Sequence, residues 1–87
     1  MEAQAIKERI YQFLIQLKQA DGLQYDTELF QSKYITSLFA LQIVQFIERE
    51  FHLKLGRRDI TEQNFHTIDA MAELVQRRLG DGGEGNG

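Results

Sequence analysis

The sequence predicts an all-α fold, a four-helix bundle of three longer helices and one short helix with a long loop between the first two. Three observations lead to this prediction. Apolar residues recur at three- and four-residue intervals in three separate segments, which is the period of an amphipathic helix. The 87 residues, 43% of them apolar, are enough for one compact core. No proline interrupts any of the three segments.

The first predicted helix covers residues 2 to about 19. Its apolar side chains form one stripe, and its charged and amide side chains fall on the other side. The stripe consists of Ala3, Ile6, Ile10, Phe13, Leu14 and Leu17. Asp21 and Gly22 then supply a stop, because glycine readily adopts the backbone conformation that ends a helix. This stripe is the first expected contribution to the core.

No sustained period follows in residues 21–36. Connections of this length are uncommon in small domains, and they are usually functional or held down by apolar anchors of their own. Asp26 or Thr27 is expected to cap a single turn that ends at Phe30. The anchors are expected to be Leu23, Leu29, Phe30, Tyr34 and Ile35.

The second predicted helix runs from Ser37 to about Phe51 and carries two apolar sets. The first set is the expected core stripe, with Ala40 at its edge. It consists of Leu41, Val44, Ile47 and Phe51. The second set, Phe39, Ile43 and Phe46, lies about 50–100° round the helix from the first. A bundle this small cannot easily bury both, so we expect part of the second set to be a contact surface or a pocket wall.

Two capping threonines mark the remaining helices. Thr61 is expected to cap a short helical turn that ends at Phe65, and Thr67 a last helix that ends at about Leu79. The apolar face of that helix consists of Ile68, Met71, Ala72, Leu74 and Val75. Residues 1–79 would therefore form the folded domain, and the glycine-rich residues 80–87 a flexible tail.

Composition excludes several classes of protein. The absence of cysteine excludes disulfides and thiolate metal sites. No apolar run approaches the length of a membrane span, and the charged N-terminal residues do not resemble a signal peptide. We therefore expect a cytoplasmic, monomeric protein without a membrane partner. A net charge of −3 argues against nucleic acid as a partner. The second helix has a single cation, Arg49, which is too few for a helix that binds in a DNA groove.

Catalysis by the domain alone is not expected. A nucleophilic serine needs a base nearby, and the histidines are His52 and His66. His52 lies on the same helix as Ser37, about 22 Å away at 1.5 Å per residue. Nothing in the sequence requires His66 to approach that serine. No metal site is outlined either, because the carboxylates are scattered singly and the histidines are fourteen residues apart.

Ser37 nevertheless has a chemically distinctive position. A helix N-terminus presents unpaired backbone N–H groups and a dipole that favours negative charge. A phosphate ester on this hydroxyl would be stabilised in the way that bound phosphates are. A serine before a helix is more often a simple N-cap, and the residues alone leave both interpretations open.

The surrounding motifs change this balance. The chain resembles the acyl and peptidyl carrier protein family in Leu29-Phe30, in Ser37-Leu38 after a short spacer, and in an amphipathic helix ending in Glu48-Arg49-Glu50-Phe51. The segment from Asp59 to Ile68 resembles the family's short third helix and the entry to its fourth. The likeness covers residues 3–79. Each motif is weak alone, and their joint order and spacing carry the resemblance.

The resemblance implies a function for Ser37. It matches the serine that receives 4′-phosphopantetheine, whose thiol carries an acyl or aminoacyl group as a thioester. The implied partners are a phosphopantetheinyl transferase, a loading enzyme and a downstream synthase or transferase. The chain itself would be a carrier, not an enzyme. Residues implied to face partners, by the matching or by their place on the second helix, are Thr36, Leu38, Phe39, Gln42, Ile43 and Phe46.

Two departures from the family pattern are informative. The family has an aspartate where this chain has Thr36, and the transferase recognises that carboxylate, so the resemblance does not by itself imply efficient modification. Phe39, Gln42 and Arg49 stand at positions that are often acidic in fatty-acid carriers. We therefore expect partners to dock mainly through apolar contact, which favours a discrete carrier in specialised biosynthesis of the polyketide or nonribosomal-peptide type.

A second hypothesis comes from a different class. The chain would then be an unmodified, carrier-like interaction module that binds its partner through Phe39, Ile43 and Phe46. The two hypotheses differ in what substitution does. A carrier depends on Ser37, whereas the interaction module depends on Phe39 and tolerates the loss of the Ser37 hydroxyl.

Overall fold

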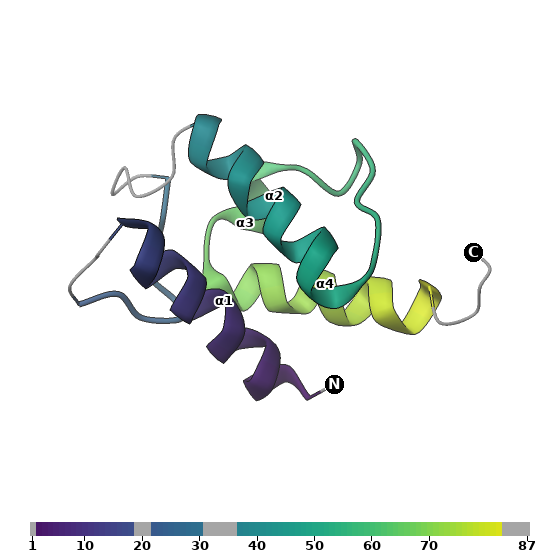
Figure 1. Ribbon diagram of the computed structural model, residues 1–87, viewed down its shortest axis with the longest axis horizontal. Helices are drawn as coiled ribbons and strands as arrows, with labels where there is room; N and C mark the ends of the chain where they lie inside the picture. The colour runs from purple at the N-terminus through teal and green to yellow at the C-terminus, as the bar shows by residue number, and fades with distance from the viewer. Residues whose placement is uncertain (1, 19–21, 31–36, 83–87) are drawn as a thin grey trace.

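The computed structural model describes residues 2–18, 22–30 and 37–82, except for the side chains at 18, 37, 81 and 82. Within these residues it contains four helices and no strand, so the predicted all-α fold is confirmed. The helices are α1 (Ala3–Lys18), α2 (Ser37–Phe51), α3 (Glu62–Phe65) and α4 (Ile68–Gly82), as Figure 1 shows. A long connection separates α1 from α2, as expected.

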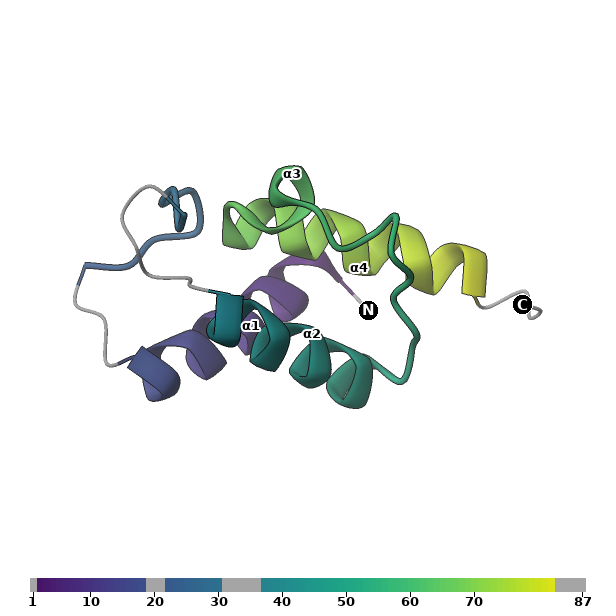
Figure 2. The same cartoon turned by 90° about the horizontal axis from the view of Figure 1, so that it is seen from above.

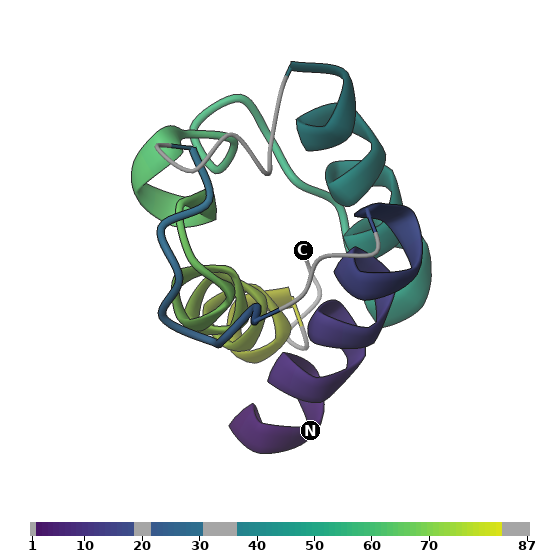
Figure 3. The ribbon, with the colours of Figure 1, turned by 90° about the vertical axis from the view of Figure 1, so that its left-hand side faces the viewer.

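The helices form two layers. α1 and α2 lie side by side in one layer, and α3 and α4 form the other (Figures 2 and 3). α4 contacts each of the other three helices. The core fills the space between the layers, so each helix has one face directed into it and one directed outward.

Residues from all three predicted apolar stripes line this core. The five residues expected from α4 are all buried, and Ile6, Ile10 and Leu14 of α1 are buried with them. Phe13 is only partly buried and packs at the edge. The buried residues are Ile6, Ile10, Leu14, Leu23, Leu29, Ile43, Val44, Ile47, Phe51, Leu55, Phe65, Ile68, Met71, Ala72, Leu74 and Val75.

The predicted orientation of α2 was partly wrong. Val44, Ile47 and Phe51 are buried as expected, but Leu41 is 55% exposed and Ile43 is fully buried. Ile43 and Ile47 are four residues apart and therefore lie on one line of the helix, whereas Leu41 is rotated by about 200° from Ile43. The core stripe is thus turned toward the second apolar set.

The connection before α2 is held to the bundle by its first half. Leu23 and Leu29 are buried, which confirms them as anchors, and Phe30 packs partly against the core. Tyr34 and Ile35 lie outside the described residues. Thr27 does not cap a following turn. Its hydroxyl instead accepts a hydrogen bond from the backbone N–H of Gln24, at 2.9 Å.

Two backbone hydrogen bonds tie this connection to the corner between α3 and α4. The N–H of Leu29 donates to the carbonyl of His66 at 2.7 Å, and the N–H of Asp69 donates to the carbonyl of Tyr25 at 3.0 Å. His66 adds a side-chain contact, since its Nδ1 lies 3.1 Å from Oε2 of Glu28. The chain is therefore fixed at several points before it reaches α2.

Tyr25 also joins the connection to α1. Its hydroxyl donates to Oε1 of Glu8 at 2.9 Å and accepts from Nε2 of Gln4 at 3.2 Å. Its ring packs edge-on against Tyr11, with 5.8 Å between the centroids. Hydrogen bonds from Gln12 and from Tyr25 lower the pKa of Glu8, and the bond to Glu8 raises the pKa of Tyr25.

We therefore expect Tyr25→Phe to lower the stability slightly at neutral pH and to flatten its pH dependence. Because the pKa of Glu8 is lowered in the folded protein, Glu8 contributes to stability above its unfolded pKa, near 4.5. This contribution is lost as the pH falls through the pKa of Glu8 in the folded protein. The raised pKa of Tyr25 makes its contribution disappear as the pH rises above about 10. Urea denaturation from pH 3 to 10 of both proteins would test this, and parallel curves would contradict it.

Both predicted threonine caps are confirmed. The Thr61 hydroxyl accepts from the N–H of Asn64 at 3.2 Å, and the Thr67 hydroxyl accepts from the N–H of Ala70 at 2.9 Å. α4 continues to Gly82, three residues beyond its expected end at Leu79. Residues 83–87 of the expected tail lie outside the described residues.

Candidate functional site

The site is built on the N-terminus of α2. The helix begins at Ser37, as the sequence predicted, while Thr36 and the Ser37 side chain lie outside the description. The first turn of α2 contains no acidic residue. The positive end of its dipole is therefore not neutralised by a carboxylate within the turn, an arrangement that suits a phosphate group.

An exposed apolar pair follows Ser37 directly. Leu38 is 65% exposed and Leu41 is 55% exposed. They are three residues apart, so they are neighbours on the outer face of α2. Large apolar side chains this exposed are unusual when they are adjacent, and such pairs mark contact surfaces more often than isolated ones do. We call Leu38 and Leu41 the leucine pair.

The structure separates the residues that the sequence placed on the partner surface. Leu38 is at the surface, as expected. Phe39, Gln42 and Phe46 are half-buried. Ile43 is fully buried between the layers, so its placement on an exposed contact surface was wrong. The reason is the rotation of α2, which takes Ile43 into the core and brings Leu41 out beside Leu38.

Phe46 has a packing role of its own. Its ring stacks on that of Phe13, with the centroids 4.2 Å apart and the planes at 11°. The two rings lie between α1 and α2 and line shallow depressions on the outer face of this layer. The expectation of a pocket wall thus holds for Phe46. Gln42 lines one of these depressions, and its buried Oε1 has no hydrogen-bond partner.

Neither histidine is shown beside Ser37. His52 is exposed at the far end of α2, and His66 contacts Glu28. Among the residues that the structure describes, no group of three histidine, aspartate or glutamate side chains could hold a metal ion. In the same residues no helix is long and apolar enough to cross a membrane. Leu41 is the surface residue that sequence reasoning missed, although its three-residue spacing from Leu38 was a visible signal.

Comparison with known proteins points in one direction. No family model matches the chain. A curated protein from Serratia sp. (strain ATCC 39006), described as probable acyl carrier protein PigG, is 34% identical over 77 residues. The matched region covers 88% of this chain and 86% of that protein, so the likeness spans the helical body and is not confined to one motif.

Proposed function

We propose, since this chain belongs to the acyl carrier protein family, that it is a discrete acyl or aminoacyl carrier modified with 4′-phosphopantetheine on Ser37. The observation that carries the proposal is the start of α2. There the serine opens a helix whose first turn has no carboxylate and whose next outward-facing residues are the leucine pair. This arrangement supports a phosphodiester and a docking surface at the same end of α2.

The chain's own residues have modest tasks in this function. The N-terminal N–H groups of α2 favour the negative charge of a phosphodiester at Ser37. The leucine pair offers apolar contact to an enzyme that approaches the same helix end. When bound, phosphopantetheine supplies the thiol that holds the cargo as a thioester, so the protein needs no nucleophile or base of its own.

The partners follow from this scheme. A phosphopantetheinyl transferase would modify Ser37, a loading enzyme would attach the cargo, and a synthase or transferase would remove it. A tethered intermediate reaches each partner at a raised effective concentration, which is the advantage of a carrier. We place the chain in specialised biosynthesis of the polyketide or nonribosomal-peptide type, because α2 lacks acidic residues in its first turn and presents leucines there.

Intact-mass spectrometry of the protein from its native host tests the proposal. The expected spectrum shows the mass of one phosphopantetheine, with or without an acyl or aminoacyl group. Treatment with hydroxylamine should release that group and leave the arm, because thioesters are cleaved and the phosphodiester is not. Protein that carries no added mass under any growth condition would overturn the proposal in favour of an unmodified interaction module.

Thr36→Asp should increase the rate of modification. The substitution restores the carboxylate that transferases of this family recognise, and one well-placed charge at the edge of an interface typically changes association about fivefold. Thr36→Asn is the matched control, since it has nearly the shape of aspartate without the charge. We expect kcat/KM for modification by a broad-specificity transferase to rise with aspartate and to stay near the original value with asparagine. Equal rates of modification for all three proteins would show that the transferase does not recognise a negative charge at position 36.

A further inference from the structure

The end of α2 and the loop that follows it carry unpaired positive charge. Arg49, Lys54, Arg57 and Arg58 are all exposed, and in the part of the chain that the structure describes their side chains have neither an ion pair nor a hydrogen bond. We call these four residues the basic edge. It is unexpected in a chain whose net charge is −3.

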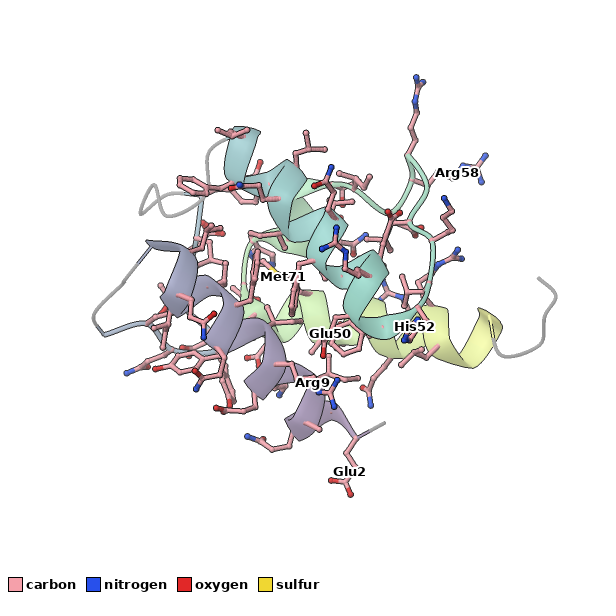
Figure 4. The ribbon with its side chains drawn as sticks, viewed as in Figure 1. Glu2, Arg9, Glu50, His52, Arg58 and Met71 are labelled. Atoms are coloured by element: carbon pink, nitrogen blue, oxygen red, sulfur yellow. The ribbon has the colours of Figure 1, made fainter. Side chains whose placement is uncertain are left out.

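Three acidic residues of the same region have partners outside the basic edge. Glu48 accepts the N–H of Leu55 at 2.8 Å. Glu50 pairs with Arg9 across the α1–α2 interface, where Figure 4 shows the two side chains together. Asp59 accepts the N–H of Gly56 at 2.9 Å and lies 3.6 Å from Nε of Arg78. None of these three carboxylates pairs with a side chain of the basic edge.

The loop that carries the basic edge is held in place. α2 ends at Phe51, and His52 follows in the left-handed conformation, with φ of 54°. The N–H of Leu53 returns to the carbonyl of Glu48 at 3.2 Å. Arg78 of α4 donates to the carbonyl of Lys54 at 2.9 Å. The side chain of Arg58 points away from the helices (Figure 4). The cations are thus presented on an ordered scaffold, which lowers the entropy cost of binding.

Arg49 connects this edge to the leucine pair. It lies eleven residues after Leu38, which corresponds to about three turns of helix and a rotation of only about 20°. Both side chains are exposed, so they stand on one line of the outer face of α2, about 16 Å apart at 1.5 Å per residue. One partner surface can therefore contact both.

We propose that the enzyme that receives this carrier has an apolar hollow for the leucine pair and a cluster of carboxylates for the basic edge, beginning about 16 Å from the Leu38 contact, where Arg49 lies. The inference rests on the proposed function only for the choice of the Ser37 end of α2 as the docking end. A protein fits this surface better than nucleic acid does. The cations lie at one end only, and a phosphate backbone gives the leucine pair nothing to bind. The pairing of opposite charges would steer the approach, and the leucines would supply the contact area.

Site-specific photo-crosslinking in an extract of the native host tests the geometry. The photoreactive residue replaces Gln45, between the leucine pair and Arg49, or Ile60, beside the loop. Gln76 on α4 is the distant control, and all three positions are exposed. We expect the first two positions to crosslink the same enzyme, with the Ile60 crosslinks on a segment rich in aspartate and glutamate. Crosslinks that fall on a neutral or basic segment, or that are absent at Ile60, would overturn the proposal.

Affinity measurements with the crosslinked enzyme then test the charge. The carrier is labelled at its N-terminus, so binding is read by fluorescence anisotropy whether or not Ser37 is modified. Combined replacement of Arg49, Arg57 and Arg58 by glutamate should weaken binding at least about tenfold at low salt and reduce its salt dependence. Arg77→Glu, a single charge reversal on α4, should have less than about a twofold effect.

The outcomes separate the two proposals. Unchanged affinity of the triple variant, or tighter binding of duplex DNA than of the enzyme at the same salt concentration, would refute the acidic partner. A protein that never acquires phosphopantetheine would refute the proposed function and leave the affinity measurement interpretable, because the label does not depend on Ser37.

Discussion

Ser37→Ala is expected to abolish modification completely. The purified protein, incubated with coenzyme A and a broad-specificity phosphopantetheinyl transferase, should gain the mass of one phosphopantetheine, and the alanine variant should gain none. The reason is chemical. In the proposed reaction the Ser37 oxygen attacks the phosphorus that carries the pantetheine in coenzyme A, the pyrophosphate bond breaks, and adenosine 3′,5′-bisphosphate leaves. No rearrangement of neighbouring residues can replace that oxygen.

The chain provides its own control for this experiment. Ser32 is the other serine in the sequence, and Ser32→Ala should be modified like the original protein. Circular dichroism should show that both variants remain helical, because even the loss of a capping hydroxyl costs only about 1 kcal/mol. If Ser37→Ala still gains the full mass, another hydroxyl carries the arm and the assignment of Ser37 is wrong.

The helices could be predicted because the relevant information is local. Apolar spacing placed α1 and α4, and the hydroxyls of Thr61 and Thr67 cap the helices that they were expected to cap. The end of α4 could not be placed in the same way. Gly80 has nothing within 4 Å of the position of a Cβ, so no packing contact marks where the helix should stop, and it continues to Gly82.

The rotation of α2 could not be read from its own sequence. Both apolar sets satisfy a helical period, and either could face the core. What decides between them is the position of α1 and α4, because the ring of Phe13 takes Phe46 to the α1 side and draws Ile43 inward. The candidate site depended on this choice. A helix turned the other way would have buried Leu41 and left Leu38 without its neighbour.

The corrected rotation predicts very different effects for two similar substitutions. Ile43 is fully buried, and Ile43→Ala removes core contacts and leaves a cavity, so the free energy of unfolding should fall by about 2–4 kcal/mol. Leu41→Ala, at a side chain that is 55% exposed, should change it by about 0.5 kcal/mol or less. Urea denaturation followed by circular dichroism measures both. The orientation of α2 predicted from the sequence, with Leu41 in the core, would instead make Leu41→Ala the more destabilising substitution.

A graded variant keeps this test decisive if the alanine protein does not fold. Small domains have about 5–15 kcal/mol of stability in total, so a loss of 4 kcal/mol is serious. Ile43→Val removes one methylene and should cost about 0.5–1.5 kcal/mol, still more than Leu41→Ala. The two positions should also separate by function, since Leu41→Ala should weaken partner docking in a protein of nearly unchanged stability. A change at Leu41 that destabilises the fold as much as one at Ile43 would contradict the placement of the leucine pair at the surface.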